Sequence, residues 1–549
     1  MIDDTLAKAA GVRLQRLLCE LRLEPADTSR QAAVSRFLQD LDFGLIGTSE
    51  DHLRTLAELL GMLLAHEVPL HPVAVGLATA LLKRRHGITS GTEPDLASAQ
   101  LQALAADPLF QAVLRRSVNV DVDLELLLRG LRRRFVLDLE QGSGLAPRHL
   151  PLLTTLVEQC FNNEHVFYED EQESRIVQAL ESRLLQTLLP GRLSTFAVDI
   201  LVFALYRPLT QGPLSDRLAG LPMHAFAPEL RDTFSRILFE PLEEVRLMAQ
   251  IPSFGALDRT GSVAVRAQYE DNPYPRWFSL GTSRSLAQAL KRKDPNFSWP
   301  ASFPSAGLQI LVPGCGTGQH PLSIAAANPG AQVLAVDLSR RSMGFALRMA
   351  RKLGIRNVSF LHCDLLDLPR LGRQFHHIDC VGVLHHLEDP LAGWRALNEV
   401  LLPGGTMKVG LYGKVARMQV SIMRKEIQRL GVQAEPAAMK LFRHQMLTEP
   451  EYEHLLKRLA GLDFFYLSGF RDLLFHVIEH QYTVSEIKDI LERLNFRFIG
   501  FEAHQLLRKY RELFPGDPAL TSLANWRKFE LHYAGSVALL TCWMARPAG

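Results

Sequence analysis

Hydrophobic spacing divides the chain into two parts with different periods. In the first part, apolar residues recur every three or four positions, as in "EDHLRTLAELLGMLLAHE" at residues 50–67. This period predicts amphipathic helices, and Gly/Pro clusters such as "EQGSGLAPRH" at 140–149 mark their ends. No helical-hairpin repeat of about 34 residues is evident. Residues 1–255 are therefore predicted to form an all-helical domain.

From residue 308 onward, short apolar runs alternate with helical stretches. The strand-like runs are "LQILVPG", "AQVLAVDLS", "NVSFLHCDLLDLP", "HHIDCVGVLHHL" and "GTMKVGLYG". Strands that alternate with helices predict parallel βαβ units and a doubly wound sheet. Residues 414–495 return to a helical pattern, and the strand-like runs "FRFIGFEAH" and "GSVALLTCWMAR" follow. We therefore expect residues 256–549 to form one α/β domain with a helical insertion before its last hairpin.

Composition and charge restrict the function classes. The 549 residues are 47% hydrophobic with a formal net charge of +2. This small charge does not favour a polyanion as binding partner of the whole chain. The basic stretch "RGLRRRF" at 129–135 fits a solvated helix face better than a nucleic-acid surface. Six dispersed cysteines without zinc spacing suit a reducing compartment. The start of the chain lacks the features of a secretion signal, and no apolar run reaches the roughly 18 residues of a membrane span. We expect a cytoplasmic protein that does not bind a membrane.

A glycine-rich turn joins the first strand-like run to a helix. Gly314, Gly316 and Gly318 in "LVPGCGTGQ" would let the backbone approach a ligand at a helix N-terminus. The dinucleotide fingerprint requires its third glycine at position 319, where the chain has Gln319. The spacing therefore disfavours a nicotinamide dinucleotide.

Two acids follow the next two predicted strands. Asp337 is placed to accept hydrogen bonds from both hydroxyls of a ribose. Asp364 is placed to meet an adenine amino group, together with the neighbouring backbone amide of Leu365. The alternatives are a helix N-cap for Asp337 and a turn residue for Asp364, with Asp367 as its competitor.

The successive motifs "LVPGCGTGQ", "VLAVDLS", "LHCDLLDLP", "GVLHHLEDP" and "LLPGGTMKVGLY" resemble those of class I S-adenosylmethionine-dependent methyltransferases. The resemblance implies a Rossmann-like sheet of seven strands, S-adenosyl-L-methionine as cofactor, and methyl transfer to an O, N or S nucleophile. In that family the glycine loop packs on the methionine part, the first acid holds the ribose and the second reads the adenine. The family places His385 of "VLHHLED" near the methyl group, either as a general base or, with His386, in a structural role.

The segment "AQYEDNPYPRW" at 267–277 precedes the glycine loop. It invites comparison with the (D/N)PP(Y/F) motif of amino-group methyltransferases, but "NPYP" lacks the Pro-Pro pair and stands in another place, so the match is judged accidental. We expect a rigid aromatic cap or, equally, a packing linker. Its candidate cap and substrate residues are Tyr269, Tyr274, Arg276 and Trp277.

More of the chain resembles a bacterial group of methyltransferase-domain proteins that are often fused to tetratricopeptide repeats. The shared motifs include "VEQCFNNEHVFYEDE", "YEDNPYPRW" and "GFRDLLFHVIEHQYTVSEI". In the last motif Arg471, His476 and His480 are candidates for lid or substrate contacts, with a structural helix as the alternative. His476 and His480 are expected one turn apart on one helix face. No third ligand or HExxH order is evident, so no metal is expected.

The leading functional prediction is a methyltransferase with an unidentified acceptor. The acceptor is either a protein or peptide that docks on the helical domain, or a small molecule that this domain covers. A cofactor-binding scaffold with a vestigial domain is the alternative, which the intact glycines and acids disfavour. An aminopropyl transferase would need paired acidic substrate residues that are not evident. Neither the acceptor atom nor the oligomeric state follows from the sequence.

Overall fold

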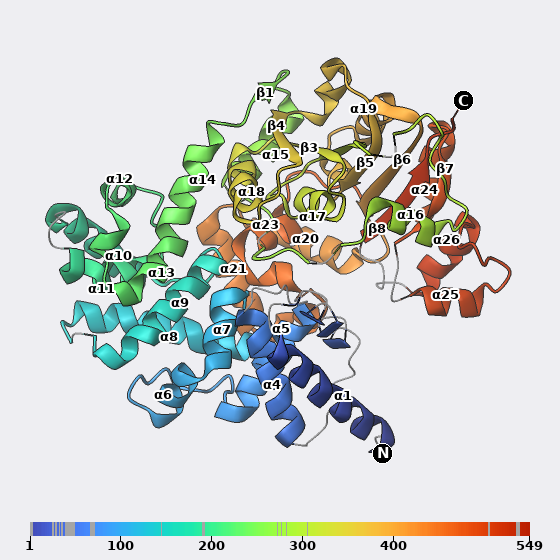
Figure 1. Cartoon of the computed structure of the whole chain (residues 1–549). Helices are drawn as coiled ribbons and strands as arrows, with labels where there is room; N and C mark the ends of the chain where they lie inside the picture. Colours follow the sequence, from blue (N-terminus) through green and yellow to red (C-terminus); the bar gives the residue numbers. More distant parts are fainter. Residues whose placement is uncertain are drawn as a thin grey trace. The chain divides into compact units, whose positions relative to one another are not determined.

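The computed structural model describes most of the chain in two compact units (Figure 1). The helical unit comprises residues 1–242, 276–281 and 432–472, and the sheet unit comprises residues 243–275, 282–431 and 473–549. The predicted domain boundary at residue 255 stays a prediction. The described residues are 4–24, 27, 30–31, 33–34, 37–38, 50–65, 72–143, 145–188, 193–271, 273–275, 277–281, 283–304, 306–459, 461–502, 506–533 and 539–548.

The helical unit is built from amphipathic helices, as the apolar spacing predicts. Among the described residues, its helices include α1 (Asp4–Leu23), α4 (Glu50–Ala65), α5 (Pro72–His86), α6 (Ala99–Ala106), α7 (Pro108–Arg116), α8 (Val122–Glu140), α9 (Leu150–Asn162), α10 (Glu171–Thr187), α11 (Leu193–Ala204) and α21 (Pro436–Thr448). Local signals set several boundaries: Asp107 caps α7 before a proline, and Asp170 and Glu173 form a capping box at α10.

Part of the predicted insertion folds with the N-terminal helices. Arg443 of α21 is 1% exposed and donates two hydrogen bonds to the carboxylate of Glu125 on α8, at 2.5 and 2.7 Å. The carboxylate of Glu164 accepts hydrogen bonds from the backbone N–H and hydroxyl of Ser468, at 2.6 and 3.0 Å. Residues 432–472 therefore belong to the helical unit, although they are separated from its first helices by the sheet in sequence.

The described part of the sheet unit forms an eight-stranded sheet with the order β1-β4-β3-β2-β5-β6-β8-β7. Strands β1 to β6 run parallel, and β8 is antiparallel to both β6 and β7. The predicted α/β fold is confirmed, with eight strands among the described residues where seven were expected; the last two strands, β7 and β8, are antiparallel neighbours but are separated in sequence by α25 and α26. The strands are β1 (Ser253–Phe254), β2 (Gln309–Pro313), β3 (Gln332–Asp337), β4 (Val358–Cys363), β5 (Phe375–Val381), β6 (Leu401–Tyr412), β7 (Arg497–Phe501) and β8 (Leu539–Ala545).

Helices connect these strands and cover the sheet. They include α15 (Thr260–Asp271), α16 (Leu286–Lys293), α17 (Gln319–Ala327), α18 (Arg340–Lys352), α19 (Pro390–Val400), α20 (Met418–Leu430), α24 (Val484–Arg493), α25 (Leu507–Leu513) and α26 (Leu523–His532). The helix α23 (Leu467–Phe475) crosses the limit between the two units. Because β2 has β3 on one side and β5 on the other, the strand order reverses there, which is where open α/β sheets bind ligands.

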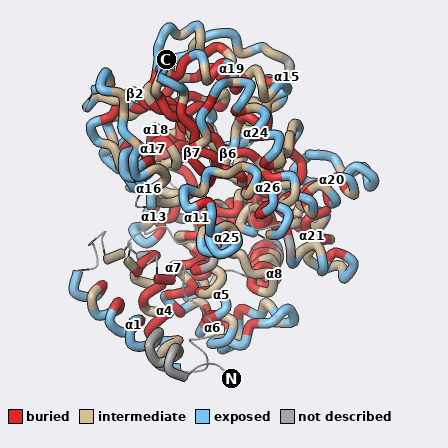
Figure 2. The backbone as a smooth tube through the Cα atoms, turned by 90° about the vertical axis from the view of Figure 1, so that its right-hand side faces the viewer, coloured by how far each residue is buried: buried red, intermediate tan, exposed pale blue. Residues whose placement is uncertain are grey.

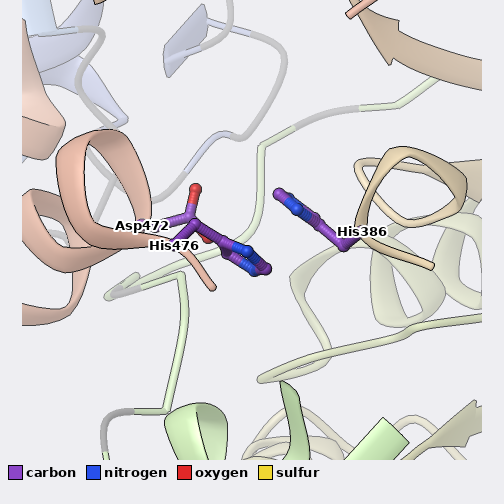
Figure 3. A group of neighbouring side chains, drawn as sticks. All are labelled: His386, Asp472 and His476. Atoms are coloured by element: carbon purple, nitrogen blue, oxygen red, sulfur yellow. The ribbon is translucent and has the colours of Figure 1, made fainter. Parts of the chain in front are cut away.

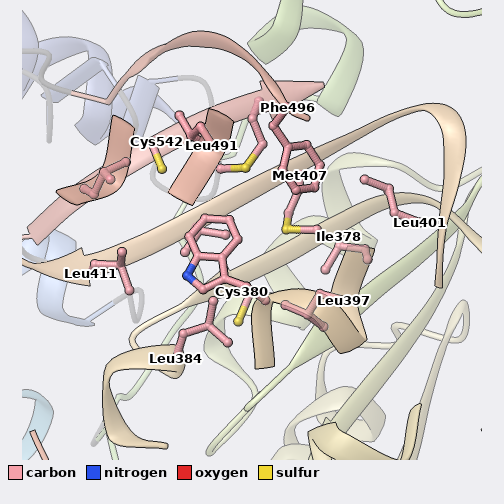
Figure 4. Packing of buried hydrophobic residues seen from close by; sticks show 14 of the residues in the cluster. Ile378, Cys380, Leu384, Leu397, Leu401, Met407, Leu411, Leu491, Phe496 and Cys542 are labelled. Atoms are coloured by element: carbon pink, nitrogen blue, oxygen red, sulfur yellow. The ribbon is translucent and has the colours of Figure 1, made fainter. Parts of the chain in front are cut away.

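The core of the sheet unit fixes the ends of β5 and β6. Alternate residues of these strands, Ile378, Cys380, Met407 and Leu411, pack with helix residues such as Leu397 in one buried cluster (Figure 4). Buried residues, which make up much of β2 to β8, are drawn red in Figure 2. Among the residues that the structure describes, no helix is long and apolar enough to cross a membrane.

Candidate functional site

The glycine loop is shaped by close contacts at each of its glycines. Gly314, Gly316 and Gly318 have φ values of 63°, 50° and 86°, the left-handed region that favours glycine. A Cβ at these positions would lie 2.3 Å from a methyl of Val383, 2.5 Å from the carbonyl oxygen of Tyr274 and 2.4 Å from the Cβ of Ala346, respectively. The loop has no space for larger residues, and α17 begins directly after it.

Asp337 joins the loop after β2 to the loop after β3. Its Oδ2 accepts a hydrogen bond from the Gly316 N–H at 2.7 Å, and its Oδ1 accepts one from the Ser339 N–H at 2.8 Å. The N-cap of α18 is Ser339, whose side chain accepts a hydrogen bond from the Ser342 N–H, so Asp337 is not the cap of this helix. Burial, with a contribution from nearby Glu270, raises the pKa of Asp337 to about 6.

Asp364 and Asp367 lie after β4 and have different partners. Oδ1 of Asp364 accepts a hydrogen bond from the Leu366 N–H at 2.9 Å, and Oδ2 accepts one from the Ser262 hydroxyl at 2.6 Å. Asp367 is engaged by Arg259 at 2.8 and 3.1 Å and by Arg370 at 3.1 Å, and hydrogen bonding from Arg259 lowers its pKa. Leu365 is buried beside Asp364. The competing acid Asp367 is therefore committed to salt bridges.

His385 is fully buried at the end of β5. Neither of its ring nitrogens has a hydrogen-bond partner among the described residues. Its ring centroid lies 4.0 Å from that of Tyr412, the last residue of β6, and 4.2 Å from that of His386. Burial holds the pKa of His385 well below its usual value, so the imidazole is neutral. The Cζ atom of Arg417 lies 3.6 Å from the centroid of the Tyr412 ring.

His386 and His476 are stacked, with ring centroids 3.6 Å apart and planes 19° apart (Figure 3). The Nδ1 of His386 lies 2.7 Å from the Ile478 carbonyl oxygen and donates to it, whereas the Nδ1 of His476 accepts from the Ile478 N–H at 3.1 Å. The Nε2 of His476 lies 3.2 Å from the Tyr269 hydroxyl. Burial lowers the pKa of His476 to about 2. The Nδ1 atoms of both histidines are engaged with the backbone of Ile478.

The prediction that His476 and His480 share one helix face is wrong. The helix α23 ends at Phe475, with Arg471 and Asp472 before that end. The chain then runs in an extended form: the His480 N–H donates to the His385 carbonyl and the Tyr482 N–H to the Tyr412 carbonyl, both at 2.8 Å. These backbone bonds to the ends of β5 and β6 replace the helical ones, so a helical period in the sequence was misleading.

The predicted cap segment, as far as it is described, contacts the loops that follow β2 and β3. The carbonyl of Pro275 accepts a hydrogen bond from the Thr317 hydroxyl at 2.6 Å, and the carbonyl of Tyr269 accepts one from the Ser339 hydroxyl at 3.1 Å. The rings of Tyr269 and Tyr274 lie 6.4 Å apart. Arg276 lies outside the described residues, and Trp277 is buried in the portion of the chain assigned to the helical unit.

Several residues of this region were missed from the sequence. Ser262 and Arg259 meet the two acids after β4, and Tyr412 meets His385. The position of Tyr412 at the end of a predicted strand was a usable signal. Ser262 and Arg259 precede the predicted sheet, and no local pattern connects them with acids about a hundred residues later.

Comparison with known proteins supports a methyltransferase. Residues 310–405 match the family model described as "Methyltransferase domain". An uncharacterized protein of Synechococcus sp., syc1184_c, is 27% identical over 304 residues, which cover 51% of this chain and 70% of that protein. A ubiquinone biosynthesis O-methyltransferase of Cereibacter sphaeroides is 35% identical over 107 residues, covering 20% of this chain and 42% of the enzyme.

Among solved structures, PKMT2 from Rickettsia typhi in complex with AdoHcy is similar at 18% identity with a TM-score of 0.37, covering 50% of this chain and 55% of that one. This chain thus spans about half the length of PKMT2 and less than half of the Cereibacter enzyme. The sequence-based prediction of an S-adenosylmethionine-dependent methyltransferase is confirmed at the level of the domain in residues 310–405.

Proposed function

We propose that the whole protein transfers a methyl group from S-adenosylmethionine to an O, N or S nucleophile of an acceptor. The observation that carries this proposal is the meeting of the glycine loop and Asp337 at the carboxyl edge of the sheet, where the Gly316 N–H donates to the Asp337 carboxylate. This edge, next to the reversal of strand order, is where such sheets bind cofactors.

The residues fit an adenosyl cofactor. Each oxygen of Asp337 accepts one backbone hydrogen bond, and a carboxylate oxygen can accept two, so the carboxylate has capacity for two ribose hydroxyls. The three glycines keep the loop free of side chains that would fill the space of the methionine part. In the proposed assignment Asp337 holds the ribose, and Asp364 with the Leu365 amide reads the adenine. The cofactor would supply an electrophilic methyl group.

On the acceptor side, His385 remains the candidate base, with a structural role as the alternative. A neutral imidazole is the form that can take a proton, and burial keeps His385 neutral. Its complete burial and its ring contact with Tyr412 support the structural alternative. A His385→Phe variant separates the two: it preserves the ring contact, so a structural role predicts nearly unchanged methyl transfer, whereas a base predicts a loss of about a hundredfold or more.

The acceptor class is also part of the proposal. A relative named an O-methyltransferase supports an oxygen nucleophile among the possibilities. The helical unit supports a protein or peptide acceptor, or a cover over a small one. Membership of the bacterial group often fused to tetratricopeptide repeats is proposed on the shared motifs, such as "YEDNPYPRW". A cytoplasmic location and a lack of nucleic-acid binding remain predictions from composition.

The test is transfer of a labelled methyl group from S-adenosylmethionine to fractions of a bacterial lysate. We expect label in a discrete protein or small-molecule fraction with the wild-type chain, and none with Asp337→Ala. Cofactor binding without label in any fraction would favour the alternative, a cofactor-binding scaffold with a vestigial domain.

A further inference from the structure

Residues 253–271 and 273–275, here named the strap, contact all three loops that end β2, β3 and β4. At the β2 loop, the carbonyl of Tyr274 accepts from the Thr317 N–H at 3.3 Å and leaves no room for a Cβ at Gly316. At the β3 loop, the Glu270 carboxylate accepts from the Arg340 N–H at 2.6 Å, at the start of α18. The strap therefore lies across the proposed cofactor site within the sheet unit.

The strap is fastened at its first end to Asp367. Arg259 donates to both oxygens of this acid, and the Ala256 N–H donates to Oδ2 at 3.0 Å. A Cβ at Gly255 would lie 2.5 Å from the same Oδ2, so the strap backbone passes directly over Asp367. Asp367 is 0% exposed. We name the Arg259–Asp367 pair the latch.

One residue of the strap makes the contact that the adenine amino group is proposed to make. The Ser262 hydroxyl, in the first turn of α15, donates to Asp364 Oδ2 at 2.6 Å, and Arg259 lies 3.3 Å from the same oxygen. The side chain of Asp364 is only 1% exposed. A base can therefore reach this carboxylate only when the first turn of α15 moves away from it.

We propose that the strap is a gate that closes the adenine site when no cofactor is bound. In the closed state, the Ser262 hydroxyl occupies the position on Asp364 that the adenine amino group takes in the bound state. The latch stabilises the closed state until the cofactor binds. The inference rests on the proposed adenine contact of Asp364. When the turn moves, the buried carboxylate loses a donor, and a buried charge without its donor is costly. An adenine amino group restores a hydrogen-bond donor to Asp364. Hypoxanthine has a 6-oxo group at the same position, which is an acceptor and cannot form a hydrogen bond with the carboxylate. Ser262 and Asp364 thereby become specificity-determining residues for the base.

The first test measures the rates of S-adenosylhomocysteine binding to the full chain by stopped-flow fluorescence. Ser262→Ala removes the competing donor, so we expect binding about tenfold tighter than wild type. Arg259→Gln removes the latch, which stabilises only the closed state, so we expect association to be about tenfold faster and dissociation to be unchanged. The matched controls are Val263→Ala, an exposed residue of the same helical turn, and Arg356→Gln, an exposed arginine outside the strap.

The controls should bind as wild type does. Unchanged rates in both strap variants, or weaker binding by Ser262→Ala, would overturn the gate. If wild type itself binds no S-adenosylhomocysteine, the cofactor assignment falls, and the gate with it. If wild type binds and the variants match it, only the gate falls.

A second measurement uses the wild-type chain and does not depend on the folding of a variant. Hydrogen exchange is followed with and without saturating S-adenosylhomocysteine, and with S-inosylhomocysteine as the base-altered probe. The gate predicts that the adenosyl ligand speeds exchange in residues 260–264 and slows it in residues 364–367, with binding of the inosyl ligand at least about tenfold weaker. Equal affinity for the two ligands, or exchange in the strap that no ligand alters, would contradict it.

Discussion

Asp337 is the single residue on which the cofactor assignment depends most. Its carboxylate is held in place by the backbone amides of Gly316 and Ser339, so its orientation is fixed before any ligand arrives. Preorganised acceptors of this kind bind hydroxyl groups without an ordering cost at the moment of binding. The same burial that fixes the carboxylate also makes its ionised form less favourable.

The affinity for S-adenosylhomocysteine should therefore depend on pH. The pKa of Asp337 is about 6, above its ordinary value, so protonation below about pH 6 removes acceptor capacity for the ribose. We expect the affinity, measured by isothermal titration between pH 5 and pH 8, to be constant above about pH 7 and to fall below about pH 6. Because the pKa of Asp337 is higher in the folded than in the unfolded chain, protonation of this group should stabilise the fold as the pH falls through 6. The loss of affinity below pH 6 is therefore not caused by unfolding through protonation of Asp337. An affinity that is flat across this range would contradict the assignment.

A Gly316→Ala substitution should destabilise the sheet unit. The left-handed backbone costs an alanine about 1 to 2 kcal/mol, and its Cβ would meet the carbonyl oxygen of Tyr274. We expect the free energy of unfolding in urea to fall by at least about 2 kcal/mol. Gly330→Ala is the control, since a Cβ there meets nothing within 4 Å. Equal stability of the two variants would show that the strap does not lie on the loop as described.

At the scale of elements, the central βαβ part was predictable because its signals are local. Each strand from β2 to β6 is a short apolar run, and Gly314 and Asp337 stand directly at strand ends. Parallel strands bring their carboxyl ends to one edge, so the meeting of the glycine loop and the acid follows from the strand order.

The strap was not predictable, because only long-range contacts define it. The strand β1 has two residues and forms by pairing with β4, about a hundred residues later. The bond between Ser262 and Asp364 likewise depends on how α15 packs. For His480 the sequence was misleading: backbone hydrogen bonds to the ends of β5 and β6 outcompete a helix whose apolar spacing looked continuous.

At the scale of the whole molecule, the chain leaves the sheet unit after Gly431 and returns after Asp472. The residues between them complete the helical unit through the buried pair of Arg443 and Glu125. A single boundary position in the sequence therefore does not separate the two compact units. No local signal marks this, because Arg443 lies in an ordinary amphipathic helix, and its partner is more than three hundred residues earlier.

An Arg443→Met substitution should expose how much this pair matters. It leaves the buried carboxylate of Glu125 without its cation, which typically costs about 3 to 5 kcal/mol. We expect the denaturation midpoint of the helical unit to fall accordingly, and the double variant with Glu125→Gln to recover part of the loss. Arg16→Met is the control, since its pair with Glu20 in the same unit is exposed and should be worth less than about 1 kcal/mol. Similar losses from Arg443→Met and Arg16→Met would refute the role of the buried pair.

The most direct test of the cofactor assignment is isothermal titration of the full chain with S-adenosylhomocysteine. It compares wild type, Asp337→Ala and the control Asp489→Ala, which changes an exposed acid on α24. We predict micromolar or tighter binding by wild type and by Asp489→Ala. Loss of two charge-assisted hydrogen bonds to the ribose should weaken binding by Asp337→Ala about a hundredfold or more. Equal affinity of Asp337→Ala and wild type, with both chains folded, would contradict the assignment of Asp337 to the ribose.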